Sequence, residues 1–207
     1  LLYLESPSRL TGAAYSPEDV AAIATLIQEN EAGVIWDQGL APWAEAISIA
    51  AQDGKPERTA LIGEGFPGLG LASWYISYIA APEGWVAPMQ KQKQIMAICT
   101  ATASQYAALE ASKLAENKQA AHLQKLNDVR SEVAPLAEAG GAHVLPGDAA
   151  CVIALKFSDG KKASALTKLN DAGYTVADGT AFGADDVLRL TLTTDGNPQA
   201  ALKLLAD

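Results

Sequence analysis

The sequence contains only two cysteines, Cys99 and Cys151, and they lie far apart in apolar stretches of the chain. We expect both to be buried thiols in a reducing compartment, rather than a disulfide or a metal-binding pair. Neither of the two histidines, His122 and His143, has the spacing to cysteine, aspartate or glutamate that a metal site requires. The sequence therefore predicts no metal site.

Positive charge is also scarce, because 15 lysine and arginine residues stand against 24 aspartate and glutamate residues, for a net charge of −9. The basic residues are scattered, and we interpret the densest group, Lys91 and Lys93, as a solvated helix face. A protein that follows nucleic-acid phosphates needs a basic surface. No nucleic-acid partner is expected.

The chain has no apolar run long enough to span a bilayer and no recognisable signal peptide. We therefore expect no membrane association and a cytoplasmic location. Its 207 residues are enough to bury a sizeable core. The sequence opens without methionine on the strand-like LLYLES, and we expect it to be the later part of a longer protein.

Alternating strands and helices are predicted in the first 82 residues. Strands are expected at residues 1–5, 34–37, 58–63 and 73–82, and helices at 16–33 and 42–54. The first helix has a clear start, because Ser16 can cap it and Pro17 suits its first position. We expect the first strand to be buried, and the fourth is apolar on both faces, which is typical of a covered sheet. The pattern predicts an α/β fold with a mostly parallel sheet, helices on both faces and functional groups at the carboxyl ends of the strands.

The second half of the chain predicts a different arrangement. Its first part is helical, with one long helix expected across residues 104–139. Glycine and proline then accumulate up to residue 147, and a small α+β layer of short strands and helices follows. We predict two domains, a partial large domain over residues 1–139 that includes the long connecting helix, and a small C-terminal domain over residues 140–207.

The segment GEGFPGLGLASWYISYI, residues 63–79, contains G-x-G-x-x-G at Gly63, Gly65 and Gly68. This is the spacing of a dinucleotide-binding loop, which must open directly into a helix whose N–H groups face the pyrophosphate. Here the glycines precede a predicted strand, and Glu64 places a carboxylate where phosphate would approach. No GxxxxGK[ST] motif occurs in the chain. We therefore reject the nucleotide interpretation.

The order of the motifs resembles the class I/II aminotransferases, which are fold-type I pyridoxal-phosphate enzymes. The resemblance runs through SPSRLTG, VIWDQGL, LIGEGFPGLGLASWYISYIAAP, SQYAALEA and GTAFGADDVLRLTL, and so covers nearly the whole chain. The corresponding family motifs are N-P-x-N-P-T-G, D-E-x-Y, S-x-S-K-x-x-x-x-x-G-x-R-x-G-Y and a last motif that ends in an arginine within a strand. The resemblance implies a partial large aminotransferase domain plus the small C-terminal domain.

The same resemblance implies that the cofactor site has been altered. The family's Schiff-base lysine falls on Pro67, which has neither an amine nor a backbone N–H. Its phosphate-binding serine falls on Glu64, and its phosphate-binding arginine on Tyr75, so the partners of a phosphate dianion are gone. Other family positions are replaced at Arg9, Leu40, Phe66 and Ser77. No cofactor is predicted, because the pyridoxal 5'-phosphate site looks lost.

Two functional positions of the family remain, Asp37 and Arg189. The resemblance makes Asp37 the carboxylate that pairs with the pyridine nitrogen, although a carboxylate at a strand end is often only a helix cap. It makes Arg189 the group that binds the substrate carboxylate, although a solvated or structurally paired arginine fits the sequence equally well. Glu64 and Asp37 are both expected to face the pocket at the carboxyl ends of the strands. A neutral or cationic ligand is therefore favoured there over a phosphate ester. Arg9 is expected to pair with one of these carboxylates or to lie on the surface.

Two functions from different classes stay open. The first is an aminotransferase-like protein that has lost catalysis and acts as a binding or scaffold module, with a small amino-acid-like ligand and a homodimer when full length. The second is an active enzyme on this fold with an atypical site. An effector domain of a transcriptional regulator is a third possibility, although no helix-turn-helix is present in this sequence.

Overall fold

The computed structural model describes residues 1–52, 57–64, 76–113, 116–158 and 160–206. Contacts between Cα atoms divide it into two compact units. The first unit comprises Leu1–Pro7 and Ala14–Gln119, and the second comprises Ser8–Ala13 and Ala120–Asp207. The expected domain boundary between residues 139 and 140 remains a prediction, whereas these contacts group most of the preceding helix with the C-terminal part.

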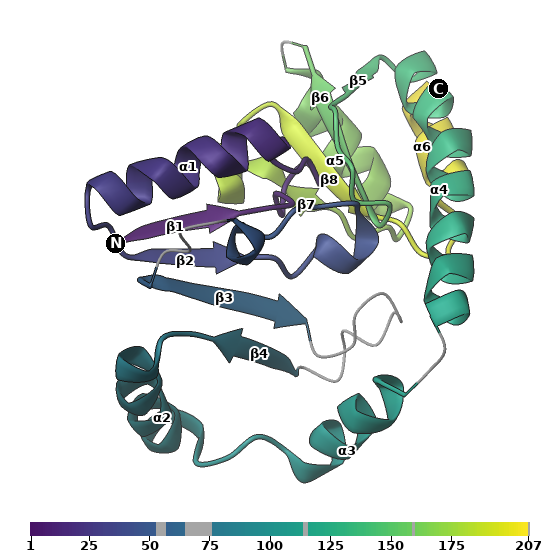
Figure 1. Cartoon of the computed structure of the whole chain (residues 1–207). Coiled ribbons are helices and arrows are strands. Elements are labelled where there is room, and N and C mark those ends of the chain that lie inside the picture. The colour runs from purple at the N-terminus through teal and green to yellow at the C-terminus, as the bar shows by residue number, and fades with distance from the viewer. Residues whose placement is uncertain (53–56, 65–75, 114–115, 159, 207) are drawn as a thin grey trace. The chain divides into compact units, whose positions relative to one another are not determined.

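The first unit is built on a four-stranded sheet in the order β1-β2-β3-β4 (Figure 1). Strands β1 (Leu2–Glu5), β2 (Val34–Asp37) and β3 (Thr59–Glu64) run parallel, and β4 (Ser77–Ala80) pairs with β3 in the antiparallel direction. A crossover helix, α1 (Pro17–Glu29), joins β1 to β2, as parallel strands commonly require. The predicted α/β fold with a mostly parallel sheet is confirmed.

Helix α1 (Pro17–Glu29) begins where the sequence predicts. The Ser16 hydroxyl accepts a hydrogen bond from the backbone N–H of Asp19 at 3.1 Å, and the Asp19 carboxylate accepts one from the Ser16 N–H at 3.3 Å. This reciprocal capping satisfies two N–H groups that the helix itself leaves unpaired. The apolar face of α1 then packs into the core of the unit, which contains the buried residues Val20, Ala24, Ile27, Val34, Trp36 and Ile49.

The helix expected over residues 42–54 is wrong. Its described part holds two short 3₁₀ helices, η1 (Ala41–Trp43) and η2 (Ile49–Ala51). Ala44 is extended, with φ −147° and ψ 160°. The Ser48 hydroxyl accepts a hydrogen bond from the Ala50 N–H at 3.3 Å and donates one to Gln38 Oε1 at 2.8 Å. Short polar side chains that bind nearby backbone in this way compete with the regular helix.

The expected burial of the first and fourth strands is also wrong. Tyr3 of β1 is 53% exposed, and Tyr78 and Ile79 of β4 are 48% and 54% exposed. Among the described residues β1 and β4 form the two edges of the sheet, so each has a neighbouring strand on one side only. Alternation predicts which residues share a face, but position within the sheet decides how far each face is covered.

The single helix expected across residues 104–139 is two helices, α3 (Thr102–Ala111) and α4 (Glu116–Ala139), which follow α2 (Glu83–Ala97). Helix α3 ends at Ser112, whose hydroxyl donates to the Leu109 carbonyl at 2.8 Å. Cys99 lies between α2 and α3 and is exposed, so the expectation of two buried thiols holds only for Cys151. None of the helices in the described part of the chain combines the length and hydrophobicity that a membrane span needs.

The second unit has its own four-stranded antiparallel sheet in the order β5-β6-β8-β7. Its strands are β5 (Ala142–Val144), β6 (Val152–Phe157), β7 (Ala177–Asp178) and β8 (Val187–Thr191), and its elements also include α4, α5 (Lys161–Asp171), η4 (Gly179–Phe182) and α6 (Pro198–Ala206). The predicted small α+β layer is confirmed. Strand β5 was not predicted, because its Gly-rich surroundings indicated a turn at His143, whereas its backbone pairs with β6.

Candidate functional site

The first unit carries two acidic side chains at the carboxyl ends of neighbouring parallel strands. Strand β2 ends at Asp37 and β3 ends at Glu64. Asp37 lies opposite Ile62 in the β2–β3 register, and Glu64 follows two residues later. Because side chains alternate along a strand, Asp37 and Glu64 stand on the same face of the sheet. We call these two residues, together with Tyr3, the strand-end cluster.

Asp37 is 4% exposed, and hydrogen bonds from Tyr3 and Gly39 hold its carboxylate in place. Its Oδ2 accepts a 2.6 Å hydrogen bond from the Tyr3 hydroxyl, and its Oδ1 accepts a 2.8 Å bond from the Gly39 N–H. The second bond closes a turn of the type that aspartate side chains commonly form with backbone two residues ahead. Helix η1 is capped at Leu40 without any side-chain bond, so the helix-cap interpretation of Asp37 is wrong. Its assignment to a cofactor stays a prediction.

Tyr3→Phe is expected to lower the free energy of unfolding by about 1 kcal/mol, because a charge-assisted bond to a buried carboxylate is lost from a half-exposed donor. Urea denaturation measures the effect. Tyr106→Phe is the matched control, since Tyr106 is 66% exposed on α3 and its hydroxyl has no hydrogen bond among the described residues. Equal stability of the two variants would contradict a structural role for the Tyr3 hydroxyl.

Gly63, the first glycine of the G-x-G-x-x-G segment, has a structural explanation in the sheet. It lies opposite Tyr78 in the β3–β4 register, and a Cβ atom at Gly63 would overlap the Tyr78 ring. The Tyr78 hydroxyl accepts a 3.3 Å hydrogen bond from Gln38 Nε2. A glycine at position 63 therefore lets an aromatic side chain cross the strand, a requirement unrelated to phosphate binding.

The second unit carries the other predicted residue, Arg189, in the middle of β8. Its partners in the neighbouring strands are Ala154 and Ala177, which leave room for the guanidinium on that face of the sheet. Arg189 Nη1 donates to Thr191 Oγ1 at 3.1 Å, whereas its Nε is buried and has no hydrogen-bond partner among the described residues. Burial lowers the pKa of Arg189. The side chain is thus half buried, paired with Thr191 and left with one unsatisfied donor, and its assignment to a substrate carboxylate stays a prediction.

Two further arginines of this unit, Arg9 and Arg130, have roles in the second unit that the sequence did not predict. The positive charge of Arg9 lowers the pKa of Arg189, while Cys151 acts in the opposite direction. Arg130 on α4 donates from Nη1 to the carbonyls of Ala149, at 2.9 Å, and Val152, at 2.7 Å. Arg130 thereby fixes the entry into β6, a contact between residues about twenty positions apart that no local pattern signals.

Among the described residues, the side chains of the strand-end cluster do not fit the phosphate group of pyridoxal phosphate. The strand-end cluster presents two carboxylates on one face, and both oxygens of Asp37 already accept hydrogen bonds from Tyr3 and Gly39. A phosphate dianion needs hydroxyl, N–H or guanidinium donors rather than the Glu64 carboxylate. The predictions at Phe66, Pro67 and Tyr75 lie outside the described residues. No group of histidine, cysteine, aspartate and glutamate in the described segments is arranged to hold a metal ion.

The family model for aminotransferase class I and II matches residues 1–205. YugH of Bacillus subtilis, whose name assigns it provisionally to the aminotransferases, is 33% identical over 111 residues, which are 52% of this chain and 29% of YugH. The aspartate aminotransferase of Pyrococcus abyssi is 30% identical over 114 residues, 53% of this chain and 29% of that protein.

Solved structures share the fold of the whole chain. The aromatic aminotransferase of Pyrococcus horikoshii matches with a TM-score of 0.86 and 23% identity, over 99% of this chain and 58% of that one. An aspartate aminotransferase of Rhodobacter sphaeroides matches with a TM-score of 0.87 and 20% identity, over 99% of this chain and 56% of that one. The chain thus spans little more than half the length of these enzymes. With the family model matching almost every residue, the chain belongs to the class I and II aminotransferase family.

Proposed function

We propose that this chain is an aminotransferase-family protein that has lost transamination and binds a small amino-acid-like ligand. The observation that carries the proposal is Pro67, which stands where the resemblance expects the Schiff-base lysine. Proline has no side-chain amine with which to hold a carbonyl cofactor or move a proton. Glu64 adds a second obstacle, since a carboxylate repels a phosphate group.

Arg189 supports the retention of ligand binding. A half-buried guanidinium with an unsatisfied Nε gains most from an anion, because a carboxylate would supply the acceptor that the chain does not. A carboxylate on a small ligand fits this donor geometry, and the alanines opposite Arg189 leave space for it. The ligand is therefore proposed to be an amino acid or a close analogue.

Calorimetric titration with L-alanine, L-leucine and L-aspartate tests this proposal. At least one is expected to bind saturably, and Arg189→Gln is expected to weaken that binding at least about tenfold, the typical effect of losing a charge-assisted bond to a carboxylate. Arg58→Gln is the matched control, because Arg58 pairs with Glu31 on an exposed surface of the first unit. Absence of binding up to about 10 mM, or equal binding by both variants, would refute the ligand proposal.

A further inference from the structure

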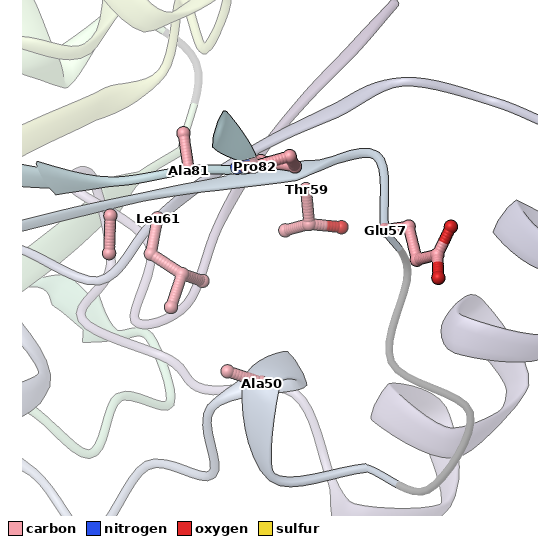
Figure 2. A pocket seen from close by; sticks show the side chains of 7 residues that line it. Ala50, Glu57, Thr59, Leu61, Ala81 and Pro82 are labelled. Carbon is pink, nitrogen blue, oxygen red and sulfur yellow. The ribbon is translucent and has the colours of Figure 1, made fainter. Parts of the chain in front are cut away.

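We draw no further inference here: the strongest candidate, the cavity of about 490 Å³ at the start of β3 (Figure 2), carries nothing because the Thr59 hydroxyl oxygen is covered from solvent, and an exposed Glu57 carboxylate beside an apolar wall does not by itself point to a ligand.

Discussion

Purified protein mixed with pyridoxal phosphate, an L-amino acid and a keto acid is expected to show no amino transfer above the rate of the buffer. The position of the Schiff-base lysine in the family is Pro67, and no other amine is predicted there. Enzymes accelerate such reactions by at least about a millionfold, so loss of the reacting group should remove any measurable rate. Chromatographic detection of the new amino acid and keto acid measures the outcome.

Pro67→Lys alone is not expected to restore the reaction. Glu64 would still present a carboxylate to the phosphate, and Tyr75 lacks the guanidinium that binds it bidentately. An active family member, such as the aspartate aminotransferase of Pyrococcus abyssi, serves as the positive control. Amino transfer by the unaltered protein that disappears in Arg189→Ala would refute loss of catalysis and favour an active enzyme with an atypical site.

The fold was predictable where residues close together in the sequence determine an element and the tertiary structure keeps it. Ser16, Pro17 and Asp19 define the start of α1 by backbone chemistry alone, and the reciprocal cap is present. The three parallel strands of the first unit follow from alternation between short apolar runs and a helix. These elements need only nearby residues for their definition, so a single sequence contains their signals.

Other elements depend on contacts between distant residues and were missed. The Ser48 hydroxyl donates to Gln38 and accepts from the Ala50 N–H, and these bonds accompany two 3₁₀ helices where an uninterrupted helix was expected. The exposure of β1 and β4 follows from their places at the sheet edges, which composition does not encode. Propensity gives the type of an element, whereas tertiary contacts decide its extent and burial.

The same distinction applies to the candidate sites. Family motifs single out Asp37 and Arg189, but they do not predict the partner that holds Asp37. Alternation could have indicated Tyr3, because the β1–β2 register pairs Glu5 with Asp37 and puts Tyr3 on the same face.

The segment Ser8–Ala13, which carries Arg9, docks against the loop before β6 within the second unit. The Gly12 carbonyl accepts hydrogen bonds from the N–H groups of both Asp148 and Ala149, each at 2.9 Å. These two hydrogen bonds hold the backbone of the segment close to Gly147. A Cβ atom at Gly147 would overlap the Thr11 carbonyl oxygen and would come within 3.2 Å of Arg130 Nη2. Only glycine fits at this position without a backbone shift.

Gly147→Ala is therefore expected to lower the free energy of unfolding by about 3 kcal/mol, because the added methyl group must displace backbone rather than a flexible side chain. Gly84→Ala is the matched control. Gly84 lies in α2 with no atom within 4 Å of the added methyl group, so alanine there should raise stability by about 0.5–1 kcal/mol. Urea denaturation of the two variants gives the comparison. If Gly147→Ala unfolds at the same urea concentration as Gly84→Ala, then Ser8–Ala13 is not packed against residues 147–149, and the effect of the Arg9 charge on the pKa of Arg189 loses its structural basis.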